Sequence, residues 1–288
     1  MIPLSVYSPF NGRGGRRAAA VALCAAALAV IAGCSTGSSS SSVPLGTTGN
    51  TGTRLTPRQA IRLAAVETQR VTSMAATFAE QVGTAATING TMQLRLKPTL
   101  LAHETLSSSS NGQSSTVEEI LSARAVYVKA PGNPSAKPWV EIKLSDLAGG
   151  LGKSLQSLLQ SAQNGNPAAQ TQMFAGSRNV HKVGTEVVNG VQTTHYAGTV
   201  TASQALRRLS PTVRKGFAPL LRLISGGIRF DIWLDDQHMA RKVVEVESVR
   251  GQTVTVTLNV TAVNQPVQIT LPPRRLVAVL PASALGGL

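Results

Sequence analysis

The chain is poor in cysteine, in aromatic side chains and in acidic residues. Its two cysteines, Cys24 and Cys34, exclude a scaffold of several disulfides and metal sites built from clustered thiolates. Aromatic residues make up only 3% of the 288 residues, and they do not alternate with basic residues as they do in nucleic-acid-binding surfaces. Thirteen acidic residues against 27 Lys and Arg give a net charge of +14, which favours an anionic partner other than nucleic acid.

The N-terminal stretch has the anatomy of a secretory signal. Three arginines lie between residues 13 and 17, an almost wholly apolar run follows at residues 18–31, and Ala32 and Gly33 precede Cys34. This is the lipobox pattern of bacterial lipoproteins, which predicts cleavage after residue 33 and a diacylglycerol thioether on Cys34. The alternative, a transmembrane helix, needs about 20 apolar residues, and the run is shorter.

The remaining sequence divides into a tether, a domain and a tail. Residues 34–54 are rich in Ser, Gly and Thr and predict a flexible tether. Residues 55–273 are expected to form one domain, and residues 274–288 an apolar C-terminal tail. Loss of residues 1–33 leaves 24 basic and 13 acidic residues, a charge of +11. We therefore expect a protein on the outer face of the cell membrane, anchored through Cys34, whose charge meets anionic lipid headgroups or cell wall.

Alternating apolar and polar residues predict about ten or eleven antiparallel strands. The clearest run is 228–234, and the Asn189-Gly190 pair predicts a tight type I′ hairpin turn. Helical spacing is expected at 57–73, 145–174 and 203–223, the last ended by Gly226-Gly227, and residues 267–271 could add a last edge strand. The fold class is α+β, a large curved antiparallel sheet (a half-barrel) with helices on its concave apolar face.

One face of nearly every predicted strand is apolar and has to be covered. Helices laid over a curved sheet could leave an apolar cavity suited to an acyl chain, or the space could be a solid core; periodicity does not separate the two. The residues expected to line such a cavity are Leu94, Leu96, Val126, Val128, Trp139, Leu151, Leu155, Leu158, Phe230, Ile232 and Trp233. The two tryptophans could instead be ordinary core or interface aromatics.

Four stretches resemble one family of exported proteins. They are Ala125-Val126-Tyr127-Val128-Lys129 with Lys137-Pro138-Trp139-Val140, the segment 190–198 (GVQTTHYAG), and Asp231-Ile232-Trp233-Leu234-Asp235 leading to Arg241-Lys242-Val243. Together with the signal, lipobox and tether they resemble the actinobacterial LppX/LprG-type lipid-carrier lipoproteins, which are similar to the LolA/LolB half-barrel carriers. The resemblance implies a curved sheet that binds di- or triacylated lipids, although the tail after Pro273 is longer and more apolar than the family's pattern.

Signs of catalysis are weak. Gly149–Ser154 resembles the end of a phosphate-binding loop, but Leu147 stands where the loop needs its first glycine. The four histidines form no metal-binding pair, no Gly-x-Ser-x-Gly motif is present, and Asp235-Asp236 suits a turn better than a cation site. The basic side of residues 203–223 could touch anionic lipid or simply face solvent.

The preferred hypothesis is a non-enzymatic carrier, without cofactor or metal. Its partners would be a lipid or glycolipid, an anionic membrane surface and an envelope transporter, and it would act as a monomer. A second hypothesis is an envelope sensor or protein-interaction module on the same fold, favoured by a large exposed apolar patch. A third, an exported hydrolase, lacks a visible nucleophile and base.

Overall fold

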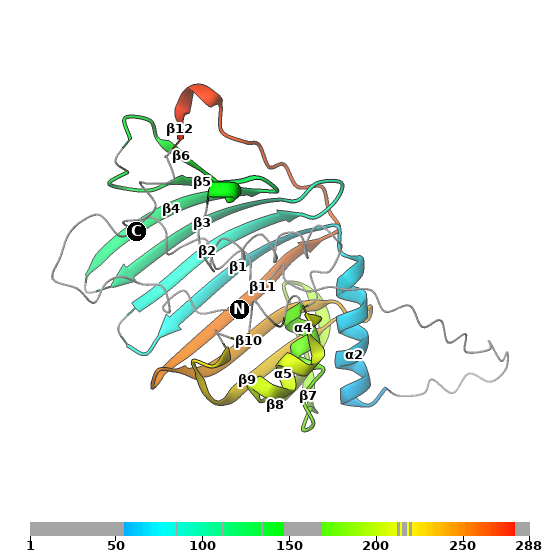
Figure 1. Ribbon diagram of the computed structural model, residues 1–288. Helices are drawn as coiled ribbons and strands as arrows, with labels where there is room; N and C mark the ends of the chain where they lie inside the picture. The colour runs from blue at the N-terminus through cyan, green and yellow to red at the C-terminus, as the bar shows by residue number, and fades with distance from the viewer. Residues whose placement is uncertain are drawn as a thin grey trace.

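The computed structural model describes residues 55–84, 86–110, 112–133, 135–146, 169–211, 214, 218 and 221–279. These residues form a single 12-stranded sheet with the order β12-β6-β5-β4-β3-β2-β1-β11-β10-β9-β8-β7 (Figure 1). Every neighbouring pair is antiparallel except β12 and β6, which are parallel. The α+β class and the large antiparallel sheet predicted from the sequence are confirmed.

The strands and helices follow the chain in a meander interrupted by short helices. The strands are β1 (Ser73–Val82), β2 (Ala86–Arg95), β3 (Leu101–Ser110), β4 (Gln113–Ser122), β5 (Ala125–Lys129), β6 (Trp139–Lys143), β7 (His181–Val188), β8 (Val191–Val200), β9 (Ile224–Leu234), β10 (Ala240–Val249), β11 (Gln252–Val263) and β12 (Val277–Val279). Helices of the described residues include α2 (Pro57–Glu67), α4 (Ala169–Phe174) and α5 (Ala202–Arg208), and 3-10 turns include η2 (Thr68–Arg70), η3 (Leu144–Asp146) and η4 (Arg274–Leu276). The described residues between 211 and 221 are helical as well. Within the described residues, we find no helix with the length and apolarity needed to cross a membrane.

Local chemistry explains where several elements begin and turn. The Thr56 hydroxyl accepts from the Gln59 amide at 3.3 Å while the Gln59 side chain accepts from the Thr56 amide at 2.8 Å, a reciprocal cap that starts α2. Asn189 and Gly190 both have positive φ, at 51° and 77°, so the predicted type I′ turn between β7 and β8 is confirmed.

Helices α2, α4 and α5 lie together over the β7–β10 end of the sheet (Figure 1). α2 packs on α4 and α4 on α5, and their main strand contacts are with β7, β8 and β9. Ala60, Ile61 and Ala64 of α2 belong to the same buried cluster as apolar residues of most of the strands. We call the sheet face that carries this cluster the inner face, and the opposite face the outer face.

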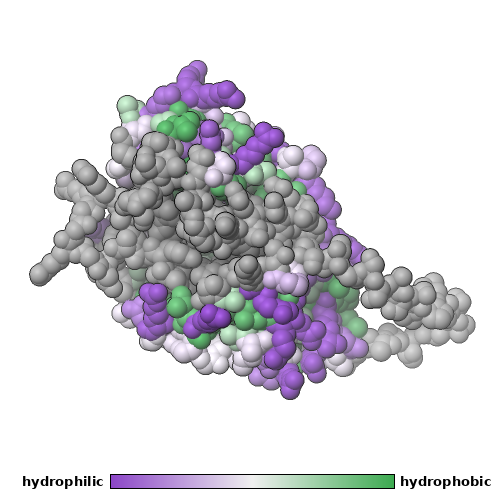
Figure 2. All heavy atoms as spheres, in the orientation of Figure 1, coloured by the Kyte–Doolittle hydropathy of each residue, from purple (hydrophilic) through white to green (hydrophobic). Residues whose placement is uncertain are grey.

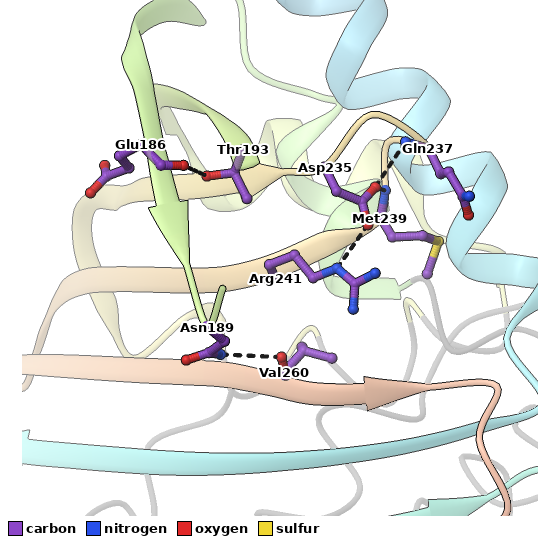
Figure 3. A network of polar contacts seen from close by, with 8 residues as sticks. All are labelled: Glu186, Asn189, Thr193, Asp235, Gln237, Met239, Arg241 and Val260. Atoms are coloured by element: carbon purple, nitrogen blue, oxygen red, sulfur yellow. Dashed lines mark hydrogen bonds and ion pairs between the residues drawn. The ribbon is translucent and has the colours of Figure 1, made fainter. Parts of the chain in front are cut away.

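The sheet is rolled rather than flat. The amide Nδ2 of Asn189, at the tip of the β7–β8 hairpin, donates to the carbonyl oxygen of Val260 in β11 at 3.4 Å (Figure 3). Three to four strand spacings of about 4.8 Å would separate these strands in a flat sheet. The hairpin therefore curls back toward the middle of the sheet, as expected of so many twisted strands.

Two details at the C-terminal end differ from the sequence prediction. Gly226-Gly227 does not end a helix; it lies within β9, where the pairing with β10 shifts register and the two glycines take φ of 80° and 154°. Residues 267–271 form no strand. Their flanking prolines lack amide donors, and Ile269 packs instead in an outer-face cluster with Ile120, Trp139 and Val277.

The predicted tail also contributes to the sheet. Beyond the expected domain end at Pro273, η4 is followed by β12, whose Val277 pairs with Trp139 of β6. The tail gives no period for this strand because β12 has only three residues, too few for alternation to be recognised.

Glycines allow two phenylalanines to lie flat on the inner face. Phe78 of β1 is paired with Gly90 of β2, and Phe230 of β9 with Gly198 of β8. A Cβ on Gly90 would stand 2.5 Å from the Phe78 ring and 2.5 Å from the Thr105 carbonyl oxygen. The absent side chain is thus a packing requirement.

We predict that Gly90→Ala lowers the free energy of unfolding by about 1–3 kcal/mol, because the added methyl group meets both a ring and a backbone oxygen. Gly184→Ala in β7 is the matched control, since a Cβ there has open space and φ is not positive. Urea denaturation should show the control within about 0.5 kcal/mol of the native chain. Equal losses for both variants would contradict this account.

Candidate functional site

The inner face brings six of the predicted site residues into one buried cluster. Leu94 and Leu96 come from β2, Val126 and Val128 from β5, and Phe230 and Ile232 from β9. Each is at most 4% exposed, and the cluster continues through β1, β3, β4, β6, β10 and β11. These side chains therefore form one apolar surface across the sheet, while their contact with a ligand stays a prediction.

Other predicted site residues lie outside the described residues. They are Leu151, Leu155 and Leu158 of the expected leucine helix, and the expected lipidation site Cys34. The expected signal, residues 1–33, and the whole of the expected tether, residues 34–54, lie outside as well.

The two tryptophans lie on the outer face, away from the six clustered residues. Trp139 packs with Ile120, Ile269 and Val277. Trp233 stacks on His195 with ring centroids 4.1 Å apart, and its indole N–H donates to the Glu186 carboxylate. Alternation explains this placement, because Trp233 stands between inward-facing Ile232 and Leu234 in β9. The geometry favours outer-face packing over a role in lining the inner face.

Five buried glutamates on the inner face were not foreseen from the sequence. They are Glu80, Glu104, Glu119, Glu245 and Glu247, each less than 5% exposed. The registers place them on this face: Glu104 pairs with Met92, for example, and Glu245 with Phe230, both members of the apolar cluster. The signal was present in the alternation Val243, Glu245, Glu247, Val249, which puts two acids on the side that β10 buries.

Glu104 and Glu119 face each other directly across β3 and β4. Oε2 of Glu104 and Oε1 of Glu119 are buried and have no hydrogen-bond partner. Burial, with added repulsion from Glu119, raises the pKa of Glu104 well above its usual range, and burial raises the pKa of Glu119 to about 8. Both carboxyls are therefore mainly neutral at pH 7.

Burial, followed by the charge of Glu245, also raises the pKa of Glu247 to about 8. Neither carboxylate oxygen of Glu247 has a hydrogen-bond partner. The polar groups of the inner face thus occur in two places, at β3–β4 and around β10, with apolar residues between them.

Glu118, the sequence neighbour of Glu119, shows the opposite behaviour on the outer face. It bonds to His103 Nε2 at 3.0 Å and to Lys129 Nζ at 3.1 Å. Burial alone would raise its pKa, but the hydrogen bonds from Lys129 and His103 outweigh burial and hold the pKa below its usual value. A solvent-open groove of about 660 Å³ next to the β5–β6 loop is lined by Glu118, Lys129 and residues of both polar and apolar type. The groove lies on the outer face, apart from the buried cluster of the inner face.

Asp235 is a structural turn residue. Its buried carboxylate accepts from the amides of Gln237 and Met239, each at 2.9 Å, and from Arg241 Nε at 2.7 Å (Figure 3). Asp236 points to solvent. No group of three or more His, Cys, Asp or Glu within the described part of the chain is arranged to hold a metal ion. The turn interpretation of Asp235-Asp236 is the one the geometry supports.

We expect Asp235→Ala to cost about 2–4 kcal/mol of stability, because it leaves two amides and a partly buried guanidinium without their acceptor. Asp236→Ala should change stability by no more than about 0.5 kcal/mol. Thermal unfolding followed by circular dichroism compares the two. A small loss for Asp235→Ala would mean that the turn is held by other contacts.

The raised pKa of Glu119 predicts a pH-dependent penalty. The unfolded chain releases this proton near pH 4.5, whereas the folded protein holds it to about pH 8. The free energy of unfolding therefore falls by about 1.4 kcal/mol per pH unit for this group as pH rises between those values. Glu119→Gln should remove that part of the slope, so the variant is more stable than the native chain at pH 8 and similar to it at pH 4.

Glu118→Gln is the control for this measurement, because the pKa of Glu118 is lowered. Its carboxylate stabilises the fold above the unfolded pKa, and the variant should gain nothing at pH 8. Urea denaturation at pH 4, 6 and 8 gives both slopes. A Glu119→Gln variant with the native slope would show that Glu119 ionises normally in the folded protein.

Comparison with known proteins finds related sequence in only part of the chain. No protein-family model matches. A protein of Streptomyces griseus described as an uncharacterized 31.2 kDa protein in the rplA-rplJ intergenic region is 31% identical over 133 residues. This match covers 45% of this chain and 42% of that protein, less than half of either.

The solved structures similar to this chain include two mycobacterial lipoproteins. Mycobacterium tuberculosis LppX is 18% identical, covers 74% of this chain and 98% of its own, and has a TM-score of 0.48. LprF from Mycobacterium bovis is 14% identical, covers 75% and 96%, and has a TM-score of 0.46. MucB of Pseudomonas aeruginosa in complex with MucA is 15% identical, covers 72% and 56%, and scores 0.34. The family named from the sequence is thus among the similar structures.

Proposed function

We propose that this chain is an exported lipoprotein, anchored through Cys34 to the outer face of the cell membrane, that binds acyl chains against its inner face. It would carry or present a lipid or glycolipid in the cell envelope as a monomer, without a catalytic step, cofactor or metal. The observation that carries the proposal is the inner face itself, one apolar cluster that extends from β2 and β5 to β9.

The energetics of such a surface suit a carrier. Each methylene group moved from water onto an apolar face contributes about 0.8 kcal/mol, so a long acyl chain can be held by burial alone. Helices α2, α4 and α5 lie over one half of the sheet and contact mainly β7, β8 and β9 (Figure 1). Leu94, Leu96, Val126 and Val128 belong to the other half, which is the half we assign to the ligand.

The distribution of charge supports a membrane-facing role. Hydrophilic residues gather around the margins of the face shown in Figure 2. The exposed basic residues of the described chain include Arg274 and Arg275 of η4 and Arg207 and Arg208 of α5. A net charge of +11 after loss of residues 1–33 would attract anionic headgroups, and would favour docking at a membrane or at an envelope transporter that delivers lipid.

The alternative, a sensor or protein-interaction module, finds less support. The exposed large hydrophobic residues of the described chain are divided between the β7 and α2 end and the β12 edge; they are Leu55, Val66, Val183, Val187, Leu271 and Val279. This distribution is not the single large patch that an obligate protein partner leaves exposed.

The test uses the full chain with Cys34→Ser, which removes the expected lipidation site. Solvent extraction and mass spectrometry should find co-purified lipid, and a BODIPY-labelled alkyl chain should bind. Leu94→Trp, which fills space on the inner face, should weaken probe binding about tenfold. Gln93→Trp, next to it but exposed on the outer face, should leave binding within about twofold.

Circular dichroism melts on both variants separate loss of binding from loss of folding. A folded native chain with neither co-purified lipid nor probe binding would remove the carrier proposal. Equal weakening by the two tryptophans would show that the inner face is not where the probe binds.

A further inference from the structure

The Glu104–Glu119 pair is unusual for a surface that would hold only hydrocarbon. Both residues are nearly fully buried, at 2% and 4% exposure. They are adjacent, because position 104 of β3 is directly opposite position 119 of β4. One oxygen of each carboxyl is buried without a hydrogen-bond partner. A buried polar atom without a partner destabilises the fold, so its presence calls for a reason.

Apolar side chains surround the pair on the inner face. Within β3 and β4 the next inward positions on either side lie about 7 Å away along the strand. Across the sheet, Glu104 is paired with β2 and Glu119 with β5. The six neighbours are Met92, Ala102, Leu106, Val117, Leu121 and Val128, all buried. The two carboxyls therefore form one polar spot, at one position along the strands, that is surrounded by apolar side chains.

We infer that Glu104 and Glu119 bind a hydroxyl group of the ligand, so that this face selects hydroxylated lipids over plain hydrocarbon chains. The inference deepens the proposed function and depends on it. A hydroxyl group can donate a hydrogen bond to the carboxyl oxygen that has no partner, and it can accept a hydrogen bond from the O–H of a neutral acid. A methylene group at the same depth would leave both unpartnered oxygens as they are.

Charge favours a hydroxyl over an ammonium group. A cationic ligand would need at least one ionised carboxylate on an apolar surface, with the high cost of desolvating both charges. Burial raises the pKa of both acids, which keeps them neutral at pH 7 and matched to a neutral partner. Lys129 and His103 do not serve the pair, because they bond to Glu118 on the opposite face.

The experiment measures competition between matched lipids for the full chain carrying Cys34→Ser. Methyl stearate and methyl hydroxystearates with the hydroxyl at several chain positions displace a BODIPY-labelled alkyl chain. At the position that reaches the pair, we expect the hydroxylated ester to bind about tenfold more tightly than methyl stearate. Several positions are needed because the pair lies at one depth only.

Variants assign the preference to the pair. In Glu104→Leu/Glu119→Leu the ratio of the two affinities should fall to about one, while methyl stearate binds at least as well as before, which shows that the variant is folded. Glu104→Gln/Glu119→Gln keeps neutral donors and acceptors and should keep a preference. Glu118→Gln changes the adjacent residue on the outer face and should leave the ratio unchanged.

Each outcome decides the inference. If the native chain binds every ester equally, the inference is wrong, whether or not the leucine variant folds; a preference that survives in the leucine variant also overturns it. Tighter binding of a long-chain amine than of any hydroxylated ester, lost with leucine at both positions, would identify a cationic ligand instead. If no ester binds at all, it is the proposed function that fails.

Discussion

The need to cover one apolar face of an open sheet constrains this structure more than any other requirement. Most of the twelve strands contribute inward side chains to one buried apolar cluster. Curling brings the β7–β8 hairpin as far as β11, and α2, α4 and α5 pack over the same end. Buried carboxyls interrupt the apolar surface at β3–β4 and around β10. We assign two uses to this one surface. Its β7–β10 end packs against the helices, and the half that contains β2 to β5 selects the ligand.

The contrast between adjacent residues shows how the pleat of a strand controls ionisation. Glu118 and Glu119 have the same side chain and differ only in direction. Glu118 meets a lysine and a histidine beside water, and its pKa falls. Glu119 meets a second carboxyl and apolar neighbours, and its pKa rises to about 8. A one-residue slip of β4 would exchange these environments, so the register of the strand and the chemistry of the inner face are fixed together.

The sequence predicts the elements that depend on local pattern. Alternation places a strand at 228–234, which the structure confirms within β9. Positive φ at Asn189 and Gly190 follows from residue type. The prediction that Gly226-Gly227 ends a helix is wrong, because a glycine pair suits a strand bulge as well as a helix terminus, and only pairing with β10 separates the two.

The candidate site is less predictable for a related reason. Alternation shows which residues share a face, and it grouped Leu94 with Leu96 and Phe230 with Ile232 correctly. It does not show which strands become neighbours, and so could not bring Glu104 next to Glu119 or place Trp139 on the outer face. Assignment of the buried face from alternation also relies on the positions of apolar residues, so an acid at an inward position is easily taken for a surface residue. Their role appears only once burial and partners are known.

The pairing of β1 with β11 has a consequence for how the protein reaches its native state. Met74 meets Val263, almost two hundred residues later in the chain, at the centre of the sheet. A ribosome or translocon delivers β1 to β6 long before β11. Until β11 arrives, β1 is an unpaired edge strand that can pair with another chain. Closure at so large a sequence separation is slow. Pairing of β1 with β11 therefore has to wait until β11 has been delivered, and a chaperone that covers the β1 edge would matter most in that interval.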